Sequence, residues 1–246
     1  MTHDTWRTQP VGVLVSGGAD SAILTADLAN DSPAVYPLYV RFGLIWEAEE
    51  EAALRRFLAK LTFPALKPLT VFQCPIREVY GEHWSTSGER TPDAETPDEA
   101  VYLPGRNLLL TSQAAIWCHL HGVPTLAWGT LRGNPFADAG DPFFESLEKT
   151  VHLALGGDLK LVRPFSGMNK TQVLLKGQHL PLEETMSCIR PTPEGMHCGA
   201  CNKCAERRKG FRDAGIPDRT QYAREGDTNL RSPGAPDFPQ TEGINS

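Results

Sequence analysis

Residues 11–30 read VGVLVSGGADSAILTADLAN and contain the turn that decides the fold. The short apolar run at 11–16 predicts a strand buried on both faces, as in a parallel sheet. Residues 22–30 continue as a helix, so Gly17 and Gly18 lie where a strand hands over to a helix. Such a strand–turn–helix unit is the usual beginning of an α/β fold.

The same alternation continues along the chain. We expect further strands at 34–42, 66–74, 124–130 and 159–165, and helices at 47–61, 106–122, 141–155 and 169–177. Strands separated by helices predict an α/β fold, a doubly wound parallel five-stranded sheet with helices on both faces. The polar stretch at 83–100 is too long for a plain connection, which predicts a functional lid or a mobile loop.

Composition narrows the class of protein. The chain has 246 residues, with 24 Lys and Arg against 30 Asp and Glu, for a net charge of −6. This acidic balance argues against broad nucleic-acid binding, which needs basic residues to neutralise phosphates, and favours a small-molecule substrate. No apolar run approaches the ~18 residues of a membrane span, and the N-terminus lacks the apolar region of a signal peptide. We therefore expect a cytoplasmic protein without a membrane partner.

Three segments are expected along the chain. Residues 10–185 form the α/β domain, residues 186–216 form a small cysteine-rich helical appendage, and residues 217–246 form a disordered tail. The tail is expected to be disordered because its apolar periodicity stops and prolines and glycines interrupt it.

The turn SGGADS (16–21), here called the phosphate loop, has the residues of an anion site. Backbone N–H groups are free at the start of a helix, where the helix dipole favours negative charge. Gly17 and Gly18 allow the backbone to approach a phosphate closely, and Ser16 and Ser21 add hydroxyl donors. Asp20 would repel an anion unless it faces a cation, so we interpret it as a Mg²⁺ partner. A tight turn without a ligand is the alternative, but the full string is more specific than a glycine pair.

Four of the six cysteines lie in one short segment with the spacing C-x9-C-x2-C-x2-C: Cys188, Cys198, Cys201 and Cys204. In a reducing compartment such a group is better explained by a metal than by disulfides. Four thiolates suit tetrahedral Zn²⁺ and leave no open position for a catalytic water, so the zinc would be structural. An iron–sulfur cluster is the alternative, and His197 is an alternative ligand.

The residues around this cysteine group carry further expectations. For Lys203, Arg207, Arg208 and Lys209 we favour a solvated helix face over a basic edge for an anionic partner. Cys74 and Cys118 lie in apolar contexts and are interpreted as free buried cysteines.

The phosphate loop resembles that of the N-type ATP pyrophosphatases, which adenylate a carbonyl oxygen and release pyrophosphate. Together with PGRN (104–107) and MSCIRPTPEGMHCGACNKCAERRKGF (186–211), the chain is similar to the QueC family of 7-cyano-7-deazaguanine (preQ0) synthases. The resemblance covers Val11 to Ile216, most of the chain.

The resemblance implies an adenine nucleotide alpha hydrolase-like (HUP) fold and an ATP-dependent ligase. Such enzymes convert 7-carboxy-7-deazaguanine and ammonia to preQ0 through an adenylated acid and an amide, for queuosine biosynthesis. The implied cofactors are structural Zn²⁺ and Mg²⁺ with ATP, and the family's tendency to dimerise implies a homodimer. The implied ATP-binding residues are Val15, Ser16, Gly17, Gly18, Ala19, Asp20, Ser21 and Gly129, and the implied catalytic residues are Asp20, Arg106 and Lys170.

The chain departs from the family pattern in two places, at residues 44–46 and 130–144. We expect the second stretch to recognise the substrate through Arg132, Asn134, Asp138 and Asp141. Trp46 and Trp128 could stack on a purine-like ring, although core packing is favoured for both. Three alternatives remain: a paralogue acting on another acid, a tRNA-thiolating enzyme of the same superfamily, and a non-catalytic zinc-stabilised module.

Overall fold

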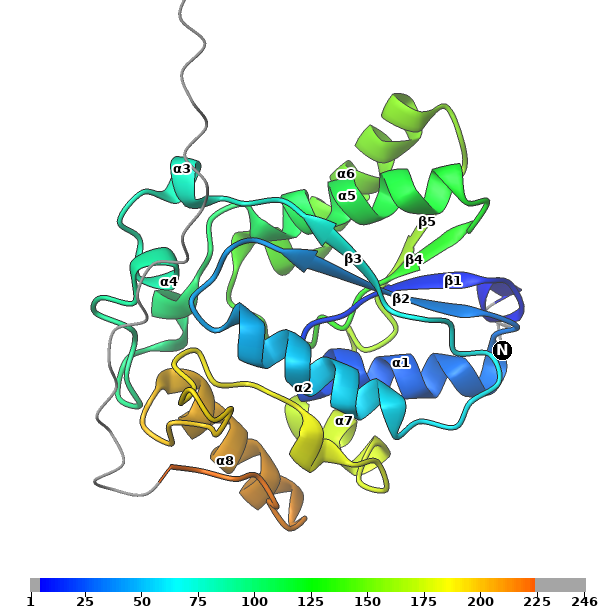
Figure 1. Cartoon of the computed structure of the whole chain (residues 1–246). Coiled ribbons are helices and arrows are strands. Elements are labelled where there is room, and N and C mark those ends of the chain that lie inside the picture. The colour runs from blue at the N-terminus through cyan, green and yellow to red at the C-terminus, as the bar shows by residue number, and fades with distance from the viewer. Residues whose placement is uncertain (1–4, 224–246) are drawn as a thin grey trace, which may run out of the picture.

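A computed structural model describes residues 5–223, and residues 1–4 and 224–246 lie outside the described part. Its centre is a parallel five-stranded sheet in the order β3-β2-β1-β4-β5 (Figure 1). The strands are β1 Val11–Leu14, β2 Val35–Arg41, β3 Thr70–Gln73, β4 Thr125–Ala127 and β5 Lys160–Val162. Each lies within a stretch expected to be a strand, so the predicted doubly wound sheet is confirmed.

Helices cover both faces of this sheet, as predicted. In Figure 1, α1 (Ala19–Asp31), α2 (Glu47–Ala59) and α7 (Lys170–Lys176) lie below it, and α5 (Arg106–Leu120) and α6 (Asp141–Leu155) lie above it. β1 serves both layers because its side chains alternate: Val11 and Val13 join the core with α1, whereas Leu14 joins the core with α5. This central burial explains why β1 is apolar throughout.

The strand order reverses beside β1, since β2 and β3 lie on one side of it and β4 and β5 on the other. Loops that leave the carboxyl ends of β1 and β4 therefore diverge to opposite faces of the sheet. In open α/β sheets this divergence opens a crevice where ligands bind. The phosphate loop follows β1 directly and lies at this position.

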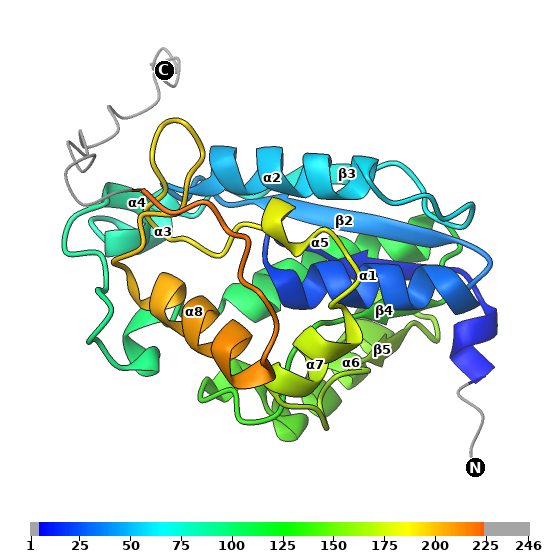
Figure 2. The same ribbon diagram turned by 90° about the horizontal axis from the view of Figure 1, so that it is seen from below.

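The cysteine-rich segment forms an appendage built on α8 (Asn202–Ala214), which packs beside α7 (Figure 2). The fold continues past the expected end of the appendage at 216. His197 and residues 221–223 exchange backbone hydrogen bonds, His197 N donating to Gln221 O at 3.0 Å and Ala223 N donating to His197 O at 2.8 Å. The expectation of disorder from residue 217 is therefore wrong for 217–223, and its remainder lies outside the described residues.

The polar stretch at 83–100 is ordered against the appendage. It contains α4 (Trp84–Ser87) and the 3-10 helix Asp98–Val101, and it follows α3 (Arg77–Tyr80). Asn202 fixes it by donating from its backbone N to Pro92 O at 3.1 Å and from Nδ2 to Thr96 O at 2.7 Å. The stretch is thus a docked wall in this structure. Other 3-10 helices span Thr5–Thr8, Ala137–Ala139 and Leu182–Glu184.

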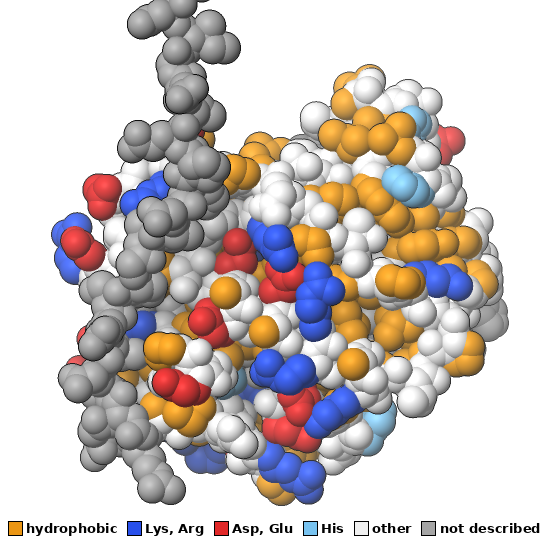
Figure 3. Space-filling view, in the orientation of Figure 1, with side chains coloured by type: hydrophobic (Ala, Val, Ile, Leu, Met, Phe, Trp, Pro, Cys, Tyr) orange, Lys and Arg blue, Asp and Glu red, His pale blue; other side chains and the backbone are white. Residues whose placement is uncertain are grey.

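The face shown in Figure 3 carries acidic and basic side chains interspersed over α2. They form ion pairs, among them Arg41 and Arg55 with Glu51, and Lys60 with Glu184. A face of mixed sign offers no continuous basic track for a phosphate backbone. Among the residues that the structure describes, no helix has both the length and the apolarity needed to cross a membrane.

Candidate active site

The phosphate loop is braced by its own hydroxyl groups. Ser16 N donates to Ser21 Oγ at 3.1 Å, and Gly18 N donates to Ser16 Oγ at 3.2 Å. A second brace comes from the far end of the chain, because Met186 N donates to Gly17 O at 2.7 Å. The loop is therefore held in shape at the start of α1, whose first residue is Ala19.

Two adjoining hollows open beside this loop. One, the aromatic lobe, has a volume of about 300 Å³, and the other, the strand-end lobe, about 360 Å³. The strand-end lobe is lined by residues at the ends of β1, β2 and β4 with part of α5: Leu14, Val15, Tyr39, Val40, Leu110, Trp128 and Gly129. Both lobes share the residues at their border: Ser16, Gly18, Asp20, Arg106, Asn107, Thr130, Asn134, Phe136, Lys170, Lys203 and Glu206.

The aromatic lobe has two pairs of stacked rings in its lining. Trp46 and Trp84 lie with centroids 5.5 Å apart and planes inclined by 15°, and Tyr102 and Phe136 lie 5.1 Å apart at 30°. Aliphatic side chains, including Ile189, complete the wall. Flat apolar walls of this kind suit a planar ring, which gains both burial and stacking.

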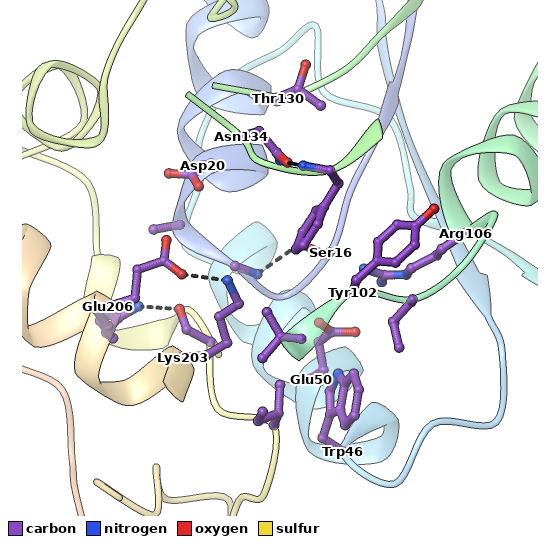
Figure 4. A pocket seen from close by; sticks show the side chains of 18 of the residues that line it. Ser16, Asp20, Trp46, Glu50, Tyr102, Arg106, Thr130, Asn134, Lys203 and Glu206 are labelled. Carbon is purple, nitrogen blue, oxygen red and sulfur yellow. Dashed lines mark hydrogen bonds and ion pairs between the residues drawn. The ribbon is translucent and has the colours of Figure 1, made fainter. Parts of the chain in front are cut away.

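Four lining residues carry a buried polar atom that has no hydrogen-bond partner among residues 5–223. These atoms are Asp20 Oδ1, Arg106 Nε, Trp128 Nε1 and Thr130 Oγ1. Leaving such an atom unpaired costs roughly 1–3 kcal/mol, so their gathering at one cavity is typical of a ligand site. Figure 4 shows the labelled side chains converging on a common space from the phosphate loop, α2, α5 and α8.

The border between the lobes is crossed by a row of charges. Lys170 Nζ lies 2.9 Å from Asp20 Oδ2 and 3.8 Å from Glu206 Oε1, and Lys203 Nζ lies 2.6 Å from Glu206 Oε2. Burial disfavours the charge of Lys170, but Asp20 and Glu206 together raise its pKa above the usual range. Lys170 is therefore a cation at neutral pH, beside the phosphate loop, as a phosphate-binding lysine requires.

Glu50 is a site residue that the sequence analysis missed. Its side chain lines the aromatic lobe and accepts a hydrogen bond from the Tyr39 hydroxyl at 2.8 Å. Burial raises the pKa of Glu50, and nearby Arg106 offsets part of that rise. Arg106 begins α5 as expected and lines both lobes.

The structure brings together three of the four residues expected to recognise the substrate. Arg132 lines the strand-end lobe, Asn134 lines both lobes, and Asp138 lines the aromatic lobe, where its Oδ2 accepts from Asn107 N at 3.2 Å. Asp141 does not join them: its side chain is 76% exposed and pairs with Arg163. Neither lobe has Asp141 in its lining.

The two tryptophans singled out from the sequence both reach the cavity. Trp46 lines the aromatic lobe and Trp128 the strand-end lobe, and each is only 5% exposed. They are therefore packed in the core and face the cavity at the same time.

The four clustered cysteines form a buried group whose sulfur atoms all lie within 4.8 Å of one another. Cys198 N and Arg190 N each donate to Cys188 Sγ at 3.3 Å, an arrangement that favours a thiolate. The donor set and its spacing fit a metal ion held by four sulfurs. His197 is not part of the group, because its Nε2 accepts from Ser187 N at 3.1 Å.

Arg207 corrects the expectation of a solvated helix face at 203–209. It is only 3% exposed, and its guanidinium donates to Thr220 Oγ1 at 2.7 Å, Thr185 Oγ1 at 2.9 Å and Leu182 O at 2.7 Å. Arg207 therefore ties α8 to the segment that precedes the cysteines and to the one that follows α8.

Neither remaining cysteine has the surroundings of a reactive thiol. Cys118 is fully buried, and burial raises its pKa to about 12. Burial also raises the pKa of Cys74. Reactive thiols need a lowered pKa and access to solvent, so neither cysteine is suited to be a nucleophile. The expectation of a free buried cysteine is confirmed for Cys118, whereas Cys74 is only half-buried at the edge of the core.

Comparison with known proteins places the chain in a family. Residues 11–215 match the family model of the queuosine biosynthesis protein QueC. The 7-cyano-7-deazaguanine synthase of Xanthomonas axonopodis pv. citri (strain 306) is 31% identical over 226 residues, covering 86% of this chain and 96% of that protein. The 7-cyano-7-deazaguanine synthase of Syntrophotalea carbinolica is also 31% identical, covering 87% and 96%.

A solved structure, a 4-thiouridine synthetase in complex with RNA and ATP, aligns with a TM-score of 0.47 and 18% identity over 84% of this chain and 51% of that one. The family match rests instead on the sequence comparisons, which span nearly the whole described fold. The chain belongs to the QueC family of queuosine biosynthesis proteins.

Proposed function

We propose that this protein is a 7-cyano-7-deazaguanine synthase, an ATP-dependent ligase that converts 7-carboxy-7-deazaguanine and ammonia to preQ0. The observation that carries the proposal is the pair of lobes that meet at the phosphate loop. An adenylating enzyme must bring a nucleotide and a carboxylic acid together at the α-phosphate, and two lobes with a cationic border provide that arrangement.

ATP occupies the strand-end lobe in this proposal. The adenine lies among the apolar ends of β1, β2 and β4, and the phosphates lie on the phosphate loop at the start of α1. Asp20, whose Oδ1 has no hydrogen-bond partner among residues 5–223, would hold Mg²⁺, and the ion would offset phosphate charge when bound. Lys170, already beside Asp20, adds a cation.

The acid occupies the aromatic lobe. Its planar ring lies against the stacked pairs, and its carboxylate reaches the border. Arg106 lines both lobes, and its Nε has no partner in the described part of the chain, so it can bind either the carboxylate or a phosphate with charge-assisted hydrogen bonds. Asn134 and Asp138 contribute hydrogen-bonding groups to the same lobe, and Arg132 contributes one to the nucleotide side.

In this reaction the residues of the site stabilise the charge on the leaving pyrophosphate and position the two substrates. A carboxylate oxygen attacks the α-phosphorus, the bond to the bridging oxygen breaks, and its electron pair leaves with pyrophosphate. Ammonia then attacks the acyl carbon, AMP leaves, and the amide forms after loss of a proton. The amide oxygen then attacks the α-phosphorus of a second ATP, and pyrophosphate leaves. The nitrogen loses both protons, and the bond between carbon and oxygen breaks with AMP as the leaving group, which gives the nitrile. None of these steps needs a protein nucleophile, which agrees with inert cysteines.

We propose Zn²⁺ for the four-cysteine group, in a structural role. A complete set of four sulfur ligands leaves no position for substrate or water, and the sulfurs are buried. The group lies between Met186 and α8, both of which border the cavity, so the metal would hold a wall of the site.

The proposal is tested by incubating the protein with ATP, Mg²⁺, ammonium and 7-carboxy-7-deazaguanine and following the products by mass spectrometry. We expect the amide and then the nitrile, with AMP formed in step. The Asp20→Ala variant is the control and should form neither. Absence of both products with the wild-type protein would overturn the substrate, and formation of AMP with a different planar acid would identify a paralogue.

A further inference from the structure

Lys203 occupies an unusual place in the molecule, because it lies between two of the clustered cysteines and also in the cavity. It is the residue before Cys204, in the first turn of α8, and it lines both lobes. Its side chain is 29% exposed, and its Nζ lies 2.6 Å from Glu206 Oε2. The appendage thus contributes a cation to the border beside the phosphate loop.

The two lysines at this border differ in the carboxylates that they contact. Lys170 lies 2.9 Å from Asp20, whereas Glu206 is shared between Lys203 and Lys170. A triphosphate brings several negative charges to the same place, and Lys170 alone is already partly neutralised by Asp20. Lys203 is the neighbouring cation, and its partner Glu206 also lies near Lys170. When Lys203 pairs with a phosphate, Glu206 can remain paired with Lys170.

We propose that Lys203 is a further catalytic residue, which pairs with the β- and γ-phosphates of ATP and stabilises the charge on pyrophosphate as it leaves. The inference rests on the proposed use of ATP by the phosphate loop. When the bond between the α-phosphorus and the bridging oxygen breaks, the electron pair moves onto pyrophosphate. Lys203 acts by its charge and takes no part in bond making or breaking.

The position of Lys203 depends on the cysteine group. It lies in the chain between Cys201 and Cys204, two of the clustered cysteines, and its neighbour Asn202 is hydrogen-bonded to the docked 83–100 stretch. A lysine on such a braced turn loses little conformational freedom on binding a phosphate, which increases the binding free energy that its charge can contribute.

The test compares Lys203→Met with Lys209→Met. Lys209 is on the same helix, but its side chain is 68% exposed, pairs with Asp213 and lines neither lobe. The probe is inorganic pyrophosphate with Mg²⁺, and its affinity is measured by titration calorimetry. We expect Lys203→Met to bind it roughly 10- to 100-fold more weakly, as for loss of a charge-assisted hydrogen bond, and Lys209→Met to be unchanged.

Steady-state kinetics and metal content complete the experiment. Lys203→Met should lower kcat/KM for ATP and leave the KM of the acid unchanged, and Lys203→Arg should recover part of both pyrophosphate affinity and rate. Zinc per chain is measured for each variant. If Lys203→Met loses its metal, the Lys203→Arg variant is used for the comparison instead. Retained pyrophosphate affinity together with retained metal in Lys203→Arg supports the proposal.

Two results would overturn it. One is equal pyrophosphate affinity in Lys203→Met and Lys209→Met with the metal retained. The other is a raised KM for the acid with unchanged pyrophosphate affinity, which would place Lys203 on the other substrate. Pyrophosphate binding requires no acid, so an incorrect acid assignment would leave this test intact.

Discussion

Gly17 should not tolerate even one added carbon atom, whereas its neighbour Gly18 should. A Cβ on Gly17 would lie 2.5 Å from Glu50 Cγ and 2.9 Å from the Glu50 backbone oxygen. A Cβ on Gly18 would meet only Ser16 Oγ at 3.3 Å within close range. The contacts at Gly17 include the backbone oxygen of Glu50 in α2, which cannot rotate away as a side chain can, so Gly17→Ala must shift the phosphate loop or the helix.

The expected cost follows from this geometry. Overpacking a fixed contact of this kind destabilises by about 1–3 kcal/mol, and 1 kcal/mol shifts Tm by roughly 2–4 °C in a domain of this size. We therefore expect Gly17→Ala to lower Tm by roughly 2–12 °C in scanning calorimetry. Gly18→Ala should stay within about 2 °C of wild type, because a serine hydroxyl can move by the few tenths of an ångström required.

A double-mutant cycle identifies Glu50 as the cause. Glu50→Ala removes Cγ and leaves the backbone oxygen, so Gly17→Ala should cost less in that background but still more than nothing. We expect a coupling free energy within the ~0.5–3 kcal/mol measured for residues in contact. Equal Tm values for Gly17→Ala and Gly18→Ala, or purely additive effects with Glu50→Ala, would refute the reasoning.

Three further outcomes are expected. Asp20→Ala should abolish ATP turnover while leaving Tm nearly unchanged, since its carboxylate is partly exposed and pairs mainly with Lys170; full activity would exclude the metal role. Elemental analysis should find about one zinc per chain, and Cys198→Ser should lower both the zinc content and the free energy of unfolding; iron absorbance would favour a cluster instead. The pKa of Glu51 is lowered by the hydrogen bond from Arg41, so its contribution to stability is complete above about pH 5 and is lost as the pH falls through the folded pKa. The difference in stability between wild type and Glu51→Gln should therefore shrink on acidification, and chemical denaturation across that range measures it.

The elements and the phosphate loop were predictable because each is encoded locally. An apolar run such as 11–16 is long enough only for a strand, and SGGADS follows it directly. Side-chain direction is not encoded in this way. Asp138 and Asp141 are three residues apart, yet only Asp138 reaches the cavity, since the turn between them points Asp141 towards Arg163.

The sequence analysis also did not predict which charged side chains are buried, because their burial depends on other elements of the fold. Glu50 lies in the acidic run EAEEEAA, where charge alone suggests a solvated face, and its burial depends on Tyr39 from a different element. Helical spacing carried a signal, because Glu50 lies on the same face as Leu54 and Phe57, both buried. Arg207 likewise shares a face with buried Cys204 and Phe211.

The phosphate loop contacts residues that lie far later in the chain, so the loop is synthesised well before the site can be completed. The phosphate loop is among the first residues made, but its partner Lys170 follows 150 residues later, and Met186 and Lys203 later still. At ribosomal rates of about 5–20 residues per second, Lys170 is made roughly 7–30 s after the phosphate loop. A nascent chain of this protein therefore carries the phosphate loop before the residues that contact it have been made. It should begin to turn over ATP only after the cysteine-rich appendage has emerged and closed onto the sheet.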